Sequence, residues 1–60
     1  MKYQVIWRNH QFGNHETVIV ESRRDLWRVL DMYGVPRREM GADQGRYTHW
    51  SDLVTWQVFS

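Results

Sequence analysis

The chain contains no cysteine, which excludes a disulfide and any metal site built on thiolates. It also has no apolar run near the ~20 residues that a membrane-spanning helix needs, and its first residues lack the apolar segment of a secretory signal. We therefore expect a soluble, cytoplasmic protein. Lysine is scarce as well, because seven of the eight cations are Arg. Arg suits bidentate contacts with carboxylates and phosphates, and it stacks on aromatic rings.

The length of the chain, 60 residues, predicts a single domain covering residues 1–60. A domain of this size buries only roughly 60% of the surface that its unfolded chain exposes, so its margin of stability is small. Four Trp, three Tyr and two Phe must supply much of the core. So many rings exceed what a small interior can enclose, and we expect some of them to be exposed and available to a partner.

Residues 22–34 have the pattern of one short helix with a marked start and a marked end. Ser22 can cap the first amide groups, and Asp25 occupies the position of a capping-box partner. Gly34 can adopt the left-handed conformation that ends a helix, and Pro36 prevents continuation. Apolar residues between these ends recur at helical spacing and predict one buried face. That face contains Leu26, Val29, Leu30 and Tyr33.

Residues 2–21 contain two runs of alternating or β-branched residues, which predicts a β-hairpin. Gly13 and Asn14 lie between the runs and suit a two-residue turn. Closing that turn would place Trp7 opposite Val20 and would put the apolar residues of both strands on one face. That face would contain Tyr3, Val5, Trp7, Val18 and Val20.

The second half of the chain adds a loop and further strands. Residues 35–45 contain Pro, Gly and charged residues and predict a long loop. Residues 46–59 are β-prone: the alternation over 53–59 predicts a strand, whereas the pattern leaves open whether 46–50 joins the sheet. The resulting order is β-β-α-β-β. We expect an α+β fold in which one helix packs on one face of a small antiparallel sheet of three to four strands.

Nothing in the sequence predicts catalysis. The serines lie at a helix start, in a turn and at the last position, and residues 41–45 lack the Lys-Ser/Thr of a phosphate-binding loop. The least implausible enzyme would be a minimal ribonuclease with His49 or His15 as its base. Together with His10, these histidines do not show the convergent spacing of a zinc site. We expect no enzymatic activity, no cofactor and no bound metal.

The positive charge is concentrated in residues 23–38, which carry a net charge of +3 in a chain whose total is +1. One interpretation is an ordinary solvated helix face on which Asp31 pairs with Arg28 or Arg24. The other is a binding surface, because Arg and Trp are the residues typical of interaction hot spots. The partner-binding residues predicted on this second interpretation are Arg23, Arg24, Trp27, Arg28, Arg37, Arg38 and Trp50.

These observations favour a small non-enzymatic module that binds a protein partner through the Arg-rich helix face and the adjacent loop. In size and shape it is similar to the compact accessory proteins with which bacteriophages and other mobile elements modulate or inhibit host proteins, a likeness to a class and not to a family motif. An exposed edge strand could also pair two copies into a homodimer. The alternative is a protein that binds single-stranded nucleic acid through Arg and Trp, although the pI of about 8.2 is low for that role.

Overall fold

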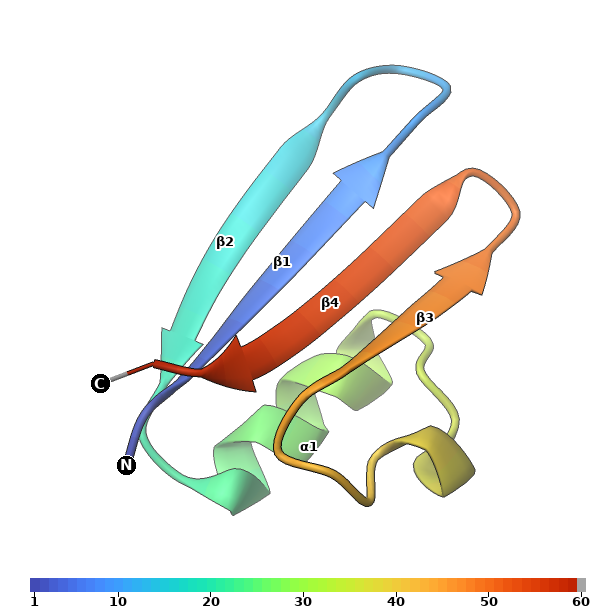
Figure 1. Ribbon diagram of the computed structural model, residues 1–60. Helices are drawn as coiled ribbons and strands as arrows, with labels where there is room; N and C mark the ends of the chain where they lie inside the picture. Colours follow the sequence, from blue (N-terminus) through green and yellow to red (C-terminus); the bar gives the residue numbers. More distant parts are fainter. Residues whose placement is uncertain (60) are drawn as a thin grey trace.

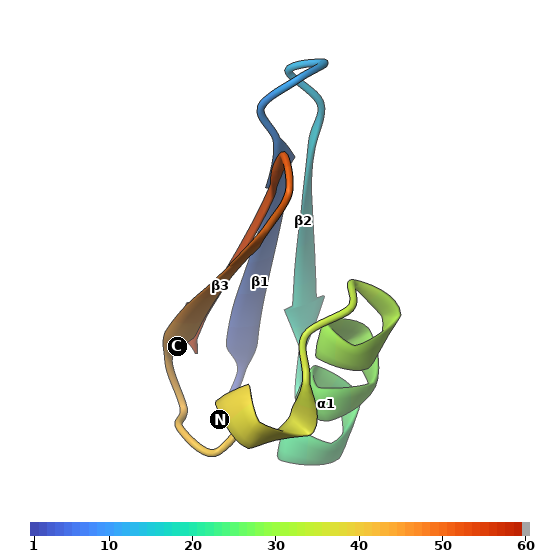
Figure 2. The ribbon, with the colours of Figure 1, turned by 90° about the vertical axis from the view of Figure 1, so that its right-hand side faces the viewer.

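The computed structural model describes residues 1–59 and shows a four-stranded antiparallel sheet with one α-helix packed on one face (Figures 1 and 2). The strands lie in the order β2-β1-β4-β3, so the first and last strands along the chain form the centre of the sheet. This architecture confirms the predicted α+β fold and its β-β-α-β-β order. The elements are β1 (Tyr3–Asn9), β2 (His15–Val20), α1 (Arg23–Met32), the 3-10 helix η1 (Arg37–Glu39), β3 (Gly45–His49) and β4 (Asp52–Val58).

Both ends of α1 have the predicted local chemistry. At the start, the Oγ atom of Ser22 accepts a hydrogen bond of 3.1 Å from the backbone N–H of Asp25. At the end, Gly34 has a φ of 85°, a value that favours glycine. The next residue, Val35, donates its N–H to the carbonyl of Leu30 at 2.9 Å, which closes a Schellman motif. The helix is therefore delimited by local sequence and is only ten residues long.

The register of the β1–β2 hairpin differs from the predicted one. Trp7 lies opposite Glu16, not opposite Val20, and Val20 instead pairs with Tyr3. The shift amounts to an even number of residues, so every side chain stays on its predicted face of the sheet. The predicted faces of the hairpin are therefore confirmed, whereas the predicted two-residue turn is wrong.

The physical reason for the shift is a longer, side-chain-stabilised loop in place of a two-residue turn. The backbone of Asn9 bonds to the carbonyl of Asn14 at 2.8 Å and accepts from the N–H of Gly13 at 2.9 Å. The side-chain oxygen of Asn9 also accepts from the amides of Gln11 and Phe12, at 3.0 and 2.9 Å. These bonds satisfy the backbone of the loop without the predicted tight turn.

The core lies between α1 and the face of the sheet that the helix covers. Leu26 and Leu30 are completely buried, as the predicted helix face requires. Of residues 46–50, for which the sequence leaves the place in the sheet open, residues 46–49 belong to β3 and Trp50 lies in the following turn. β3 pairs with β4 from Gly45 to His49. Neither helix within residues 1–59 has the length and apolar character to span a membrane. The buried core residues are Tyr3, Val5, Leu26, Leu30, Val35, Met40, Val54 and Trp56.

Candidate functional site

An open cleft of about 600 Å³ lies between α1 and the segment that contains η1. Its helical wall consists of residues spaced i, i+3, i+4 and i+7, which place their side chains on a single stripe of the helix. Because the chain reverses direction at Gly34 and Pro36, residues from 37 onward return alongside that stripe. The lining residues are Arg24, Trp27, Arg28, Asp31, Arg37, Met40 and Gly41.

Three guanidinium groups of this cleft carry uncompensated positive charge. Among residues 1–59, no carboxylate lies within 4.0 Å of the guanidinium nitrogens of Arg24, Arg28 or Arg37. Asp31 lines the same cleft, but the ion pairs that it could form with Arg24 or Arg28 are absent from this part of the chain. The ion pairs of the alternative interpretation are therefore absent from residues 1–59, and the three arginines with Asp31 give the cleft lining a net charge of +2.

Apolar surface lies next to these charges. The side chain of Trp27 is 45% exposed, although its neighbour Leu26 is completely buried. Met40 also contributes to the cleft and is nearly buried. An indole beside guanidinium groups offers both apolar contact area and a surface on which a planar group can stack. Such combinations of Trp and Arg are enriched where binding energy is concentrated.

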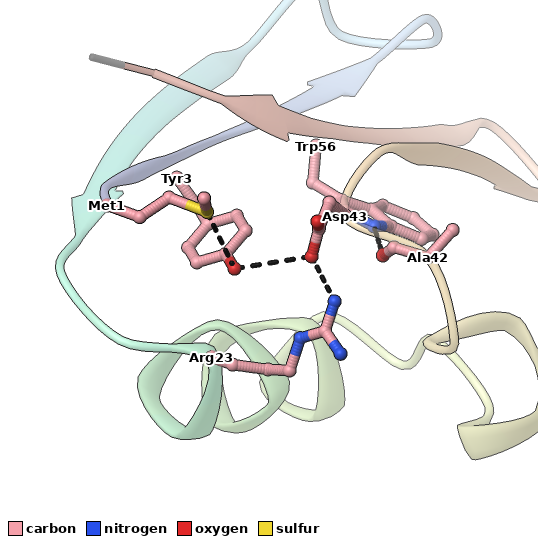
Figure 3. Close-up of polar contacts among 6 residues, drawn as sticks. All are labelled: Met1, Tyr3, Arg23, Ala42, Asp43 and Trp56. Atoms are coloured by element: carbon pink, nitrogen blue, oxygen red, sulfur yellow. Dashed lines mark hydrogen bonds and ion pairs between the residues drawn. The ribbon is translucent and has the colours of Figure 1, made fainter.

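Arg23 has a different role from its neighbours on the helix. Its guanidinium donates to a carboxylate oxygen of Asp43, and the hydroxyl of Tyr3 donates to the same oxygen at 3.2 Å (Figure 3). The hydrogen bond that Arg23 donates to Asp43 raises the pKa of Arg23 above its usual value, and the nearby hydroxyl of Tyr3 raises it further. Beside this contact, the indole N–H of Trp56 donates to the carbonyl of Ala42 at 3.2 Å. Arg23 thus helps to hold the loop before β3 against α1 and the sheet.

The remaining predicted site residues also lie apart from the cleft lining. The Nε atom of Arg38 lies 3.8 Å from a carboxylate oxygen of Glu39, its neighbour in η1. Trp50 belongs to the β3–β4 turn, at the end of the sheet far from α1 and η1 (Figures 1 and 2). It is 91% exposed and stacks on His49 at a centroid distance of 5.8 Å. The structure therefore brings together Arg24, Trp27, Arg28 and Arg37 and leaves out Arg23, Arg38 and Trp50.

Sequence reasoning did not assign Asp31, Met40 and Gly41 to the site. The position of Asp31, seven residues after Arg24, was a usable signal because it falls on the same helical stripe. Met40 and Gly41 carried no such signal. Their place in the cleft depends on how the chain turns back after α1.

A second aromatic contact lies at the end of α1. Trp7 and Tyr33 stack with their ring planes nearly parallel, at an interplanar angle of 3° and a centroid distance of 6.0 Å. Burial raises the pKa of the Tyr33 hydroxyl, and the nearby charge of Glu16 raises it further. The contact stabilises the junction of helix and sheet and has no part in the cleft.

The histidines do not form a metal site in the described part of the chain. His10, His15 and His49 are all exposed, and no three potential ligands among residues 1–59 converge. Comparisons of this chain with protein-family models, with curated proteins and with solved structures gave no match.

Proposed function

We propose that this protein is a non-enzymatic binding module that holds an acidic segment of a partner protein in the cleft beside α1. The observation that carries the proposal is the convergence of Arg24, Arg28 and Arg37 on one cleft, without a carboxylate of residues 1–59 within 4.0 Å. A partner carboxylate would supply the missing counter-charge through bidentate bonds. The expected location is the cytoplasm, whose reducing conditions do not affect the stability of a chain that has no Cys.

The composition of the cleft favours a protein segment over a nucleic acid. A phosphate backbone requires cations spread along a track, whereas these cations gather around one open cavity. Asp31 in the wall would repel a second phosphate or a second carboxylate alike, but it could accept a hydrogen bond from a peptide N–H, a donor that a phosphate backbone lacks. Trp27 and Met40 offer apolar contacts for a side chain next to the carboxylate. The module would then act as a modulator or inhibitor of its partner, in the manner of the phage accessory proteins to which it is similar in size.

Affinity capture from the native cell, followed by mass spectrometry, tests this assignment. The double substitution Arg24→Glu/Arg28→Glu reverses two charges of the cleft and should abolish capture of the specific partner. Arg8→Glu/Arg46→Glu is the matched control, because it makes the same change of charge at exposed arginines that do not line the cleft. Undiminished capture of every specific partner by a folded Arg24→Glu/Arg28→Glu protein would refute the assignment.

Labelled single-stranded DNA and RNA distinguish the alternative. If the cleft binds protein, neither probe should bind at low salt. A nucleic-acid-binding protein would instead give a complex whose affinity falls steeply as salt is raised, because phosphate contacts release counterions. If such a complex is lost in Arg24→Glu/Arg28→Glu and kept in Arg8→Glu/Arg46→Glu, the partner of the cleft is a nucleic acid and not a protein.

A further inference from the structure

A surface separate from the cleft lies along β2, which is one edge of the sheet. Among residues 1–59, β1 is the only strand that pairs with β2. Four of its six residues have exposed side chains, among them Ile19, which is 43% exposed. β2 is therefore an exposed edge strand that is rich in β-branched residues.

The hydrogen-bond pattern shows which backbone groups of β2 are free. Asn9 donates to Asn14 at a position that continues the β1–β2 register, and in an antiparallel pair hydrogen-bonded positions alternate with non-bonded ones. The pairs that exchange hydrogen bonds are therefore Trp7–Glu16, Val5–Val18 and Tyr3–Val20. The N–H and C=O groups of His15, Thr17 and Ile19 consequently point outward. No backbone group elsewhere in residues 1–59 bonds to them.

The two edges of the sheet differ in how they are protected. On β3 the same alternation leaves the backbone groups of Arg46 and Thr48 free, and Arg46 places a charge in the middle of that edge. Charged residues, prolines and bulges are the usual devices that keep edges from pairing. Residues 17–20 of β2 are Thr-Val-Ile-Val and contain no charge and no proline. β2 carries the charged Glu16 near its start, so it is residues 17–20 of the β2 edge that are left without such protection.

We infer that β2 pairs in antiparallel fashion with β2 of a second copy of this chain, which would join the two sheets into one. The register that uses most of the free groups places Val18 on the two-fold axis, facing Val18 of the second copy. Thr17 then faces Ile19 of the second copy, and each such pair can exchange two backbone hydrogen bonds. At the ends, His15 faces Glu21 of the second copy, so like charges do not meet. A second copy thus fits this edge in its hydrogen bonds, its apolar side chains and its charges.

Analytical ultracentrifugation over a wide concentration range tests the pairing. The wild-type protein should reach an apparent mass of twice 7.4 kDa as its concentration rises. Ile19→Lys places a charge at the centre of the edge and should return the mass to that of a single chain. Thr48→Lys, which makes a similar change at the free edge of β3, should leave the dimer intact. A wild-type chain that stays monomeric at all concentrations, or a dimer that is lost equally in both variants, would overturn the inference.

Amide hydrogen exchange on the wild-type protein gives a test that does not depend on how a variant folds. The amides of Thr17 and Ile19 should exchange quickly in dilute solution and slowly when the protein is concentrated. The free amides of Arg46 and Thr48 should remain fast under both conditions. Fast exchange of Thr17 and Ile19 in a sample that is dimeric by mass would show that the dimer uses another surface, and the inference would fail. The cleft beside α1 is not involved, so this result is independent of the proposed function.

Discussion

The contact between Gly45 and Trp56 leads to a sharp prediction about the core. A Cβ atom added at Gly45 would clash with the indole of Trp56, coming within 2.8 Å of its Cε2 atom and closer still to Cζ2. Trp56 is only 3% exposed, and its N–H is bonded to Ala42, so the ring cannot move aside freely. Gly45→Ala should therefore act as an overpacking substitution that costs about 1–3 kcal/mol.

That cost is a large part of the free energy of unfolding of the domain. At about 0.05–0.15 kcal/mol per residue, a chain of 60 residues has a free energy of unfolding of about 3–9 kcal/mol. With a urea dependence of about 1 kcal/mol per molar, the unfolding midpoint of Gly45→Ala should fall by about 1–3 M. Urea titration followed by far-ultraviolet circular dichroism measures this shift.

Two further variants separate the clash from a general effect of replacing glycine. Gly41→Ala adds the same methyl group where no atom lies within 4 Å, so its midpoint should hardly change. Trp56→Phe removes the atoms that would clash, so Gly45→Ala should cost less in the Trp56→Phe background than in the wild type. A Gly45→Ala protein as stable as Gly41→Ala would refute the packing of Trp56 against β3.

Three more predictions concern single side chains. Leu30→Ala should cost about 2–5 kcal/mol in urea titration, because Leu30 is completely buried; a loss below about 1 kcal/mol would contradict that burial. Trp50→Gly should raise the unfolding midpoint, since Trp50 has a φ of 57°. Removing the left-handed strain of Trp50 should gain about 1–2 kcal/mol, which exceeds the extra entropy cost of folding a glycine, about 0.5–1 kcal/mol. A lower midpoint would show that stacking on His49 outweighs the strain. The pKa of Tyr33 is raised in the folded state, so the unfolded chain ionises first and stability should fall as the pH rises above about 10. Tyr33→Phe should weaken this alkaline loss, and an unchanged pH profile would contradict the shift.

The fold could be predicted where local chemistry decides the structure. Ser22 and Gly34 delimit α1 through bonds to residues at most four positions away, and these positions can be recognised in the sequence. The faces of the hairpin were also predictable, because they depend only on alternation. The register was not, because the side chain of Asn9 satisfies the amides of a longer loop in competition with a tight turn.

The candidate site was predictable only in its helical part. Arg24, Trp27 and Arg28 share a stripe that helical spacing reveals. Whether an arginine is free depends on contacts between distant segments, and no local pattern shows that Arg23 meets Asp43, twenty residues away. The exposure of Trp50 likewise depends on the β3–β4 turn, because the composition alone allowed it to be core or surface.

The most direct test of the central claim, a preassembled cationic cleft, is a titration observed through the Nε–Hε resonances of the arginines. The probe is a short peptide of Glu and Trp residues, which presents carboxylates beside an apolar ring. The resonances of Arg24, Arg28 and Arg37 should shift together, whereas those of Arg8 and Arg46 should not move. If all the exposed arginines shift alike, or if Arg8 and Arg46 respond first, the cleft is no more than ordinary surface charge and the account is wrong.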